Sequence, residues 1–179
     1  MGNFAGYRLR GRVRLREGHS IMSIQNREER VTVRPAQATD LHRVAQLFDL
    51  YRQFYKHPPD LPLAEKFISD RFASQESVIL VASTAAPAIV GFTQLYPTFC
   101  SVSAGPIYVL YDLFVAEPSR RQGVARTLLT AAHAHAKQTG AVRLELATAI
   151  TNVKAQALYE SLGWVRDVEF HRYSLATGN

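Results

Sequence analysis

Hydrophobic and polar residues follow patterns that change from one kind of element to the next along the chain. The stretch VTVRPA at 31–36 alternates as a short strand does and stops at a proline. In the next stretch, ATDLHRVAQLFDLYRQFY, apolar residues recur over 41–51 at the spacing of a helix face, and Thr39 or Asp40 suits the N-cap. The domain is therefore expected to open with a strand and a helix.

Loops, strands and helices then alternate to the end of the chain. Two consecutive prolines predict a loop over KHPPDLPL at 56–63, and AEKFISDRFA at 64–73 has the spacing of a shorter helix. Three strand-like runs, a helix, a strand and a helix follow at 77–84, 88–99, 107–115, 122–139, 141–149 and 152–163. Two more strand-like segments, around WVRD at 164–167 and EFHRYSLA at 169–176, close the chain, and no internal repeat is present.

Composition limits the class of protein. With 179 residues, 47% of them hydrophobic, the chain is long enough for one domain with a substantial core. Its longest apolar stretch, SVILVASTAAPAIVGF, is broken well short of the roughly 20 residues that a membrane-spanning helix needs. Cys100 is the one cysteine, which excludes an internal disulfide and fits a reducing compartment, so we expect a soluble, cytoplasmic protein. A catalytic Cys100 is disfavoured, because TFCSVS offers no adjacent helix start or basic group that would lower the pKa of the thiol.

The positive charge is concentrated at the N-terminus. The net charge is +6, and residues 1–30 hold seven Arg and three Glu, which gives +4 there and leaves +2 for residues 31–179. In this tail Arg alternates with Gly, Leu and Val, without the apolar run of a secretory signal. Three interpretations remain: an unstructured extension, a basic arm for an anionic partner, or upstream codons with translation starting at Met22. We favour the first and the third, because Arg alternating with Gly has no face to bury, and we expect the domain over 31–179.

The stretch PSRRQGVARTLLTAA at 118–132 places two arginines and a glycine directly before an apolar helical pattern, with no acidic residue. A helix start offers free backbone N–H groups and the positive end of the helix dipole, so Gly123 would let an anionic oxygen approach closely. Arg120 and Arg121 would add charge at the rim, and Ala125 would leave the first turn uncrowded. The alternative is an ordinary glycine near a helix start with solvated arginines. The pattern is neither a Walker loop nor a dinucleotide-binding turn.

Neighbouring segments decide between these alternatives. The strand YVLYDLFVAEP leads into Arg120-x-x-Gly123-x-Ala125, and the segment TNVKAQALYESLGW follows downstream. Together they resemble the GCN5-related N-acetyltransferase (GNAT) superfamily, whose members transfer an acetyl group from acetyl-coenzyme A to an amine. The specific part of the resemblance covers about residues 107–166, and the order of elements extends it to roughly 31–177. The residues that carry its later part are Asn152, Ala155, Tyr159, Gly163 and Trp164.

The resemblance implies the fold and the mode of donor binding. The fold is of the α/β (α+β) class, one domain with a mixed, mostly antiparallel central sheet flanked by helices. Strand 107–115 splays from its neighbour, and its free backbone groups pair with the pantetheine arm. The N–H groups of 121–126 bind the pyrophosphate, the N–H of Val115 stabilises the oxyanion, and no metal is required. The donor-binding residues implied are Leu113, Phe114, Val115, Arg120, Arg121, Gln122, Gly123, Val124, Ala125, Arg126, Asn152 and Tyr159.

Tyr159, Asp112 and Tyr111 are the candidates for catalysis. By resemblance, Tyr159 protonates or hydrogen-bonds the departing thiolate, and packing against the helix face is its alternative role. The amine arrives largely protonated, and Asp112 is the carboxylate of the central strand that could take a proton, directly or through water. The alternative to this role as a base is a structural one, in which Asp112 holds a backbone group or an arginine. Polyamine-acetylating relatives have a Glu-Asp pair where this chain has Tyr111-Asp112, so the chain departs from their pattern at this point.

The acceptor site, by the same resemblance, lies between the first helix pair and the last strands. Its candidate residues are Tyr51, Phe54, Tyr55, Tyr96 and His171. Aromatic residues at helical spacing more often belong to a core, which is the alternative for this set. Asp49, Asp60 and Asp112 could receive a cationic amine, although scattered acids are usually solvated surface. His133 and His135 stand two apart on a helix and make a poor metal pair.

We therefore expect a cytoplasmic, acetyl-coenzyme A-dependent N-acetyltransferase that acts by direct attack of the primary amine of a small molecule, without an acyl-enzyme. Its partners are acetyl-coenzyme A and the amine, with neither a membrane nor nucleic acid, and a homodimer is left open. Three alternatives stay in view. They are a peptide or protein acetyltransferase acting on an N-terminus or a lysine, a non-catalytic coenzyme A-binding module, and a nucleic-acid-binding protein that uses the arginine tail.

Overall fold

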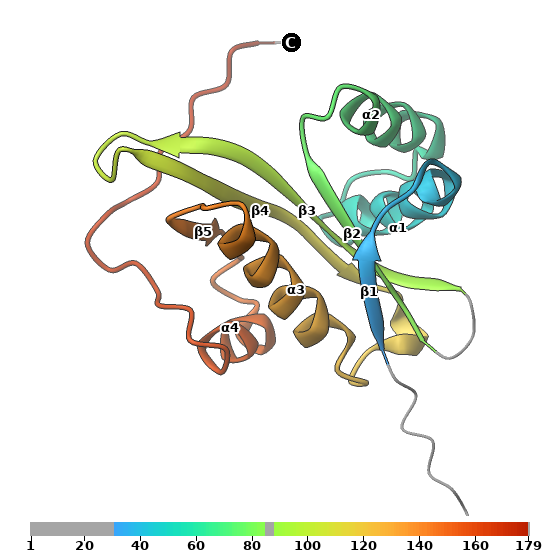
Figure 1. Ribbon diagram of the computed structural model, residues 1–179. Helices are drawn as coiled ribbons and strands as arrows, with labels where there is room; N and C mark the ends of the chain where they lie inside the picture. The colour runs from blue at the N-terminus through green and yellow to red at the C-terminus, as the bar shows by residue number, and fades with distance from the viewer. Residues whose placement is uncertain (1–30, 85–87, 179) are drawn as a thin grey trace, which may run out of the picture.

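A five-stranded sheet forms the central layer of the fold, with the strands in the order β1-β2-β3-β4-β5 (Figure 1). The computed structural model describes residues 31–84 and 88–178, so the basic extension expected over 1–30 lies outside the described residues. The strands are β1 (Thr32–Pro35), β2 (Val78–Ser83), β3 (Ile89–Cys100), β4 (Gly105–Val115) and β5 (Arg143–Leu146). Neighbouring strands from β1 to β4 pair antiparallel, and β5 pairs with β4 in parallel. The mixed, mostly antiparallel sheet expected from the sequence is confirmed.

Helices cover both faces of this sheet (Figure 1). Helices α1 (Leu41–Phe54) and α2 (Leu61–Ala73) lie on one face, α3 (Val124–Gln138) and α4 (Val153–Glu160) on the other, and two 3-10 turns, η1 (Ala38–Asp40) and η2 (Glu117–Ser119), precede α1 and α3. Phe48 and Phe92 belong to the apolar layer under α1, and Leu95 and Leu128 to the layer under α3. The predicted α+β class is confirmed. No helix in the described part of the chain is long and apolar enough to cross a membrane.

Helix α2 begins earlier than the sequence predicted. The loop expected over 56–63 is wrong for its last three residues, because α2 starts at Leu61. Pro62 stands in the first turn, where its missing N–H costs no helical hydrogen bond. The Asp60 side chain accepts a hydrogen bond from the Leu63 N–H at 3.0 Å and so caps the helix. Pro62 therefore belongs to the start of this helix, whereas Pro58 and Pro59 belong to the loop before it.

Helix α1 begins behind Asp40, which occupies the N-cap position without a side-chain cap bond. Its carboxylate instead accepts from the Gln37 N–H at 2.7 Å and from Arg34 Nη1 at 2.6 Å. The hydrogen bond from Arg34 is the main reason that the pKa of Asp40 is lowered. Asp40 thus fastens the connection from β1 to α1; its predicted N-cap position is confirmed, although its side chain does not bond the first N–H groups of the helix.

A bulge in β4 determines which of its side chains face which helices. Consecutive residues of β3 pair with Asp112 and Leu110, so Tyr111 is an extra residue without a partner in β3. Side chains alternate between the two faces of a strand, and an extra residue reverses that alternation. Leu110 accordingly packs in the layer under α3, whereas Phe114 packs in the layer under α1. The bulge thereby turns Asp112 toward α1.

The sheet opens along the other edge of β4. The pairing of β4 with β5 ends at Leu110 and Leu146, while β4 continues to Val115. Within the described residues, no strand lies beside the edge of β4 from Tyr111 to Val115. The splayed central strands expected from the resemblance are confirmed, and they leave backbone groups free at this edge.

The chain after α4 departs from the sequence prediction. Among the described residues no strand follows α4, so the strands expected around 164–167 and 169–176 are wrong. Beyond Trp164, which packs against the layer under α3, their large apolar side chains are exposed, from 79% for Phe170 to 93% for Val165. A strand needs the hydrogen-bonding edge of another strand, and this segment runs past the sheet without pairing (Figure 1). Alternation of side chains indicates a strand but does not supply its partner.

Candidate active site

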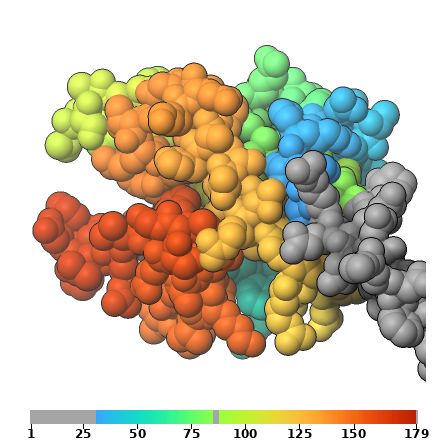
Figure 2. All heavy atoms as spheres, turned by 60° about the horizontal axis from the view of Figure 1, so that its bottom comes forward, coloured from blue at the N-terminus to red at the C-terminus, as the bar shows by residue number. Residues whose placement is uncertain are grey.

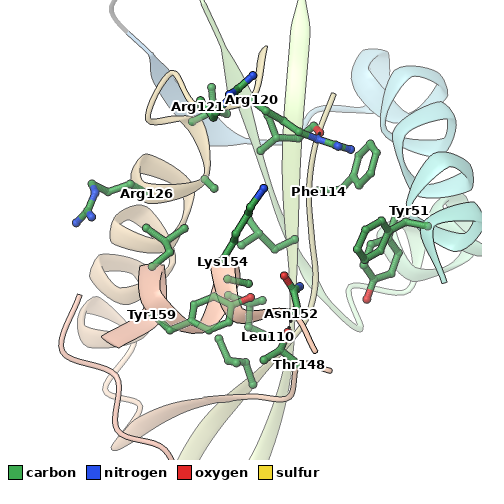
Figure 3. Close-up of a pocket in the computed structure, with 18 of the residues that line it drawn as sticks. Tyr51, Leu110, Phe114, Arg120, Arg121, Arg126, Thr148, Asn152, Lys154 and Tyr159 are labelled. Carbon is green, nitrogen blue, oxygen red and sulfur yellow. Dashed lines mark hydrogen bonds between the residues drawn. The ribbon is translucent and has the colours of Figure 1, made fainter. Parts of the chain in front are cut away.

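A pocket of about 610 Å³ lies along the open edge of β4. The start of α3 bounds one end, α4 one side, and the last turn of α1 the other end (Figure 3). In the space-filling view, the region of α4 (red) and the segment before α3 (gold) face each other across a hollow with part of the α1 side (teal) behind it (Figure 2). Small-molecule sites commonly have volumes of roughly 300 to 1,000 Å³, so the pocket has the size of a ligand site.

The end of the pocket near α3 has the geometry of an anion site. Gly123 stands immediately before α3 with a φ of 80°, in the left-handed region that favours glycine. A Cβ at this position would meet no atom within 4 Å, so the backbone is open to an approaching ligand. The first N–H groups of α3 have no acceptor within the helix and point out of its N-terminus. The turn can therefore hold a phosphate group.

The arginines around this turn have different partners. Arg120 Nε donates to the Val115 carbonyl at 3.0 Å, at the open edge of β4. The guanidinium of Arg126 instead points away from the pocket and donates to Ser161 Oγ at 2.8 Å (Figure 3). Arg120 and Arg121 are thus the arginines placed to contact an anion, and Arg126 can contribute its backbone.

Leu113 and Val115 direct their peptide groups to the pocket. The Ala116 N–H donates across the sheet to the Val90 carbonyl at 2.8 Å. Neighbouring residues of a strand direct their peptide groups to opposite edges, so Val115 and Leu113 face the open edge. A ligand that carries amide groups can pair with this edge as another strand would.

Tyr159 is half-buried on α4 and its hydroxyl points into the pocket (Figure 3). Burial raises the pKa of this phenol, and the Thr148 hydroxyl opposes the rise by hydrogen bonding. The raised pKa keeps the phenol protonated at neutral pH. Asn152 also reaches this part of the pocket, and its Nδ2 lies 3.4 Å from Thr148 Oγ1. The Tyr159 hydroxyl can therefore donate a proton or a hydrogen bond to a group bound here.

Asp112 is a buried carboxyl on the α1 side of β4. Its exposed fraction is 6%, and burial raises its pKa to about 7, against a smaller lowering by the Tyr51 hydroxyl beside it. The same hydroxyl donates to the Tyr111 carbonyl at 2.9 Å. Tyr51 lines the pocket and Asp112 does not, so a proton moving from the pocket to Asp112 would pass the Tyr51 hydroxyl. A carboxyl with this pKa changes its charge near neutral pH.

The structure brings only some of the acceptor candidates together. Tyr51, Phe54 and Tyr55 line the pocket at the end of α1. Tyr96 does not line the pocket. It packs edge-on against Tyr111, which is a lining residue, with 5.4 Å between the ring centres. His171 lies in the exposed segment after α4, outside the pocket. Its placement at the acceptor site depended on final strands that do not form.

The other two acidic candidates have structural partners. The Asp49 carboxylate accepts from the Asp60 N–H and from Gln53 Nε2, both at 2.8 Å. The Asp60 carboxylate is the cap of α2. Both residues lie outside the pocket and fasten the connection from α1 to α2.

Comparison with known proteins identifies the family. Residues 42–164 match the acetyltransferase (GNAT) family. The chain belongs to this family. It is 45% identical over 145 residues to the uncharacterised N-acetyltransferase YhfO of Bacillus subtilis, covering 81% of this chain and 97% of that protein. It is 32% identical over 111 residues to an L-ornithine N5-acetyltransferase of Arabidopsis thaliana, covering 60% of this chain and 43% of that protein. A crystal structure of a probable acetyltransferase superposes with a TM-score of 0.78 at 38% identity, covering 83% of this chain and 99% of that chain.

The GNAT resemblance is thereby confirmed, and the protein is an acetyl-transferring enzyme. Enzymes of this family take the acetyl group from acetyl-coenzyme A. The pocket fits such a donor, because a turn suited to phosphate and an open strand edge suited to amide groups lie along one surface. Gly123, Leu113 and Val115 could hold the donor by their backbone groups.

Lys154 is a pocket residue that was not predicted from the sequence. It stands in the first turn of α4, and its ammonium points into the pocket toward Arg120 (Figure 3). A cation is disfavoured in the first turn of a helix by the helix dipole, so Lys154 could have been recognised as a residue with an anionic partner. Gln122, by contrast, was expected at the site but donates its side-chain amide to the Pro118 carbonyl at 3.0 Å and does not line the pocket.

Gly123→Glu is expected to raise the dissociation constant for acetyl-coenzyme A by at least about tenfold, roughly 1.4 kcal/mol, because bulk and negative charge enter the anion site together. Isothermal titration calorimetry measures this constant. Gly140→Glu is the matched control, because Gly140 lies at the opposite end of α3, has a φ of 75° and would also give its Cβ no neighbour within 4 Å. Equal affinities in the two variants would remove phosphate binding from the Gly123 turn.

Asp112→Asn is expected to make the protein more stable relative to wild type as pH rises. The carboxyl has a folded-state pKa of about 7, above its ordinary value of 3.8, so ionisation above pH 4 progressively destabilises the wild-type fold. Asparagine does not ionise. The difference in unfolding free energy between variant and wild type should therefore shift in favour of the variant by roughly 2 to 3 kcal/mol between pH 5 and pH 8. Urea denaturation at both pH values measures it, and a difference independent of pH would contradict the raised pKa.

Cys100 lies outside the pocket, in a cluster with Ser103 and Arg143. Hydrogen bonding to Ser103, supported by Arg143, lowers the pKa of the thiol to about 7. No basic group stands beside Cys100 in the sequence, because Arg143 comes from β5, 43 positions later in the chain. Among the described residues, no group of three His, Cys, Asp or Glu side chains is placed to hold a metal ion.

Proposed function

We propose that the protein transfers the acetyl group of acetyl-coenzyme A directly to the primary amine of a small molecule. One observation carries the proposal: a single pocket has a turn suited to phosphate at Gly123 and the Tyr159 hydroxyl toward its other end. Asp112 lies just outside the pocket, behind Tyr51. The bound donor supplies an activated carbonyl carbon and a thiolate leaving group.

The donor is held along the open side of β4. The backbone N–H groups at Gly123 bind the pyrophosphate, and Arg120 and Arg121 compensate its charge. The peptide groups of Leu113 and Val115 pair with the pantetheine amides. The Val115 N–H stabilises the negative charge that develops on the carbonyl oxygen during attack.

Two protons leave the nitrogen and one reaches the sulfur during the reaction. Asp112 receives the first proton of the arriving ammonium by way of the Tyr51 hydroxyl, which frees the nitrogen lone pair to form the C–N bond. Tyr159 gives its proton to the sulfur as the C–S bond breaks, the second proton of the nitrogen restores Tyr159 as the amide forms, and Asp112 releases its proton to solvent. Cys100, the one thiol of the chain, lies outside the pocket, which supports direct transfer without an acetylated cysteine.

A small-molecule acceptor is supported by two features. The acceptor end of the pocket is closed on one side by the last turn of α1, with Tyr51, Phe54 and Tyr55. The similar plant protein acts, by its name, on the side-chain amine of ornithine, which is a small molecule.

A screen of small primary amines and peptides that follows release of free coenzyme A thiol tests the proposal. We expect thiol release that depends on a small amine and yields its acetyl amide in equal amount. Release with peptides alone would make the protein a peptide acetyltransferase. Tight binding of acetyl-coenzyme A without turnover on any amine or peptide would make it a non-catalytic binding module.

A further inference from the structure

Three half-exposed aromatic side chains line the acceptor end of the pocket. Phe54 is 56% exposed, Tyr55 is 42% exposed and Tyr111 is 55% exposed. We call these three residues the aromatic rim. The core under α1 is filled by other side chains, such as Phe48 and Phe92, and does not need these three rings. An exposed group of large apolar side chains beside a pocket marks a binding surface for an apolar ligand group.

The rim is held in a defined geometry. The rings of Phe54 and Tyr55 meet edge to face at 5.2 Å and 90°, and Tyr55 meets Tyr51 at 5.1 Å. Tyr111 is supported by the edge-on ring of Tyr96 behind it. Rings that are already fixed in this way lose little freedom when a further ring or a branched aliphatic group packs on them.

The charges around the pocket are unsuited to a polycation. Among the described lining residues none is Asp or Glu, and the four charged ones are Arg120, Arg121, Arg126 and Lys154. The carboxyl of Asp112 lies behind Tyr51, so it can serve one ammonium. A second ammonium on the same acceptor would find no carboxylate in the pocket and would approach the cationic end.

We propose that the acceptor is a monoamine in which a short chain joins the single amino group to an aromatic ring or a branched aliphatic group. The proposal rests on the proposed function and specifies its acceptor. The apolar group packs on the aromatic rim, and the amino group points inward to the space between Tyr51 and Tyr159. The C–N bond forms there with the proton transfers already described, so no further reactant is required.

Steady-state kinetics of the full chain on matched amines test the proposal. The probes are 2-phenylethylamine, isoamylamine, ethylamine, putrescine and spermidine, each with saturating acetyl-coenzyme A. We expect kcat/KM for 2-phenylethylamine or isoamylamine to exceed the values for the other three amines by at least about tenfold. A higher kcat/KM for putrescine or spermidine would overturn the apolar monoamine and leave the proposed function standing. Turnover with none of these amines would count against the proposed function itself.

Substitution of the rim gives a second test that does not depend on the absolute rate. Phe54→Ala should lower the ratio of kcat/KM for 2-phenylethylamine to that for ethylamine by about tenfold. The matched control is Phe99→Ala, because Phe99 is 80% exposed on β3 and lies outside the pocket. Melting curves confirm that both variants fold, which the exposure of both side chains favours. An unchanged ratio in Phe54→Ala, as in the control, would overturn the role of the rim.

Phe54→Asp adds the carboxylate that the acceptor end lacks. Its relative kcat/KM for putrescine over 2-phenylethylamine should rise at least about tenfold, because the second ammonium then has a partner. A ratio equal to that of Phe54→Ala would show that the charge of this wall does not select the acceptor and would overturn the argument from charge.

Discussion

Tyr159→Phe is expected to lower the rate of acetyl transfer by roughly 10 to 100-fold. The substitution removes the hydroxyl that points into the pocket and leaves the ring. The centre of this ring lies 6.1 Å from that of Trp164. Stability and donor affinity should therefore change little. General acid assistance can contribute about 10² to 10⁴ in rate, and a thiolate is already a fair leaving group, so the lower part of that range applies.

Single-turnover kinetics measure this effect on the transfer step rather than on product release. The control is Tyr108→Phe, because Tyr108 is also a half-buried tyrosine in contact with the layer under α3 but lies outside the pocket. The loss should shrink with an acyl thioester whose thiol has a lower pKa, since a better leaving group needs less protonation. Transfer by Tyr159→Phe at the wild-type rate would leave this tyrosine with a packing role.

Asp112→Asn is expected to lower kcat/KM by about 10²-fold at pH 7, because the arriving ammonium loses the group that takes its proton. The pKa of about 7 fixes the sign of the pH dependence. In the wild type, kcat/KM should rise as pH increases through about 7, because the carboxyl must be ionised to accept a proton. The variant should lack the inflection near pH 7. It acts on the free amine, whose fraction keeps rising with pH, so its deficit should shrink as pH approaches the pKa of the amine.

The pH profile distinguishes this role from a structural one. Asp49→Asn is a suitable control, because Asp49 is a buried carboxyl of α1, is 8% exposed, and accepts hydrogen bonds from Gln53 and from the Asp60 N–H outside the pocket. Asp49→Asn should destabilise the fold and keep the wild-type inflection near pH 7. A profile of Asp112→Asn with the same shape as wild type would show that Asp112 acts as a structural carboxyl.

The order of the elements could be predicted because local patterns determine it. The start of α2 was predicted too late, because a proline such as Pro62 occurs both in loops and in the first turn of a helix. The strands expected after Trp164 failed for a different reason. Their alternation is real, but a strand forms only beside an available edge, and the pairing of distant segments is not contained in a local pattern.

The donor end of the pocket could be predicted from a short motif, whereas the acceptor end could not. Gly123 and the helix behind it are neighbours in sequence, so their joint geometry follows from the local chain. The contact of Tyr51 with Asp112 joins α1 to β4 across 61 positions and depends on the bulge at Tyr111. A bulge of one residue has no strong sequence signal, yet it decides whether the carboxyl faces α1 or α3.

Direct transfer from the donor to a small amine in this pocket is tested most directly by rapid-quench single-turnover kinetics. Enzyme in excess over acetyl-coenzyme A is mixed with the best amine of the screen, and free thiol, acetyl amide and acetylated protein are each quantified over time. We expect thiol and acetyl amide to appear at one rate and in equal amounts, with no thiol released before the amine is added. Thiol release without the amine, together with an acetyl group on the protein, would contradict direct transfer.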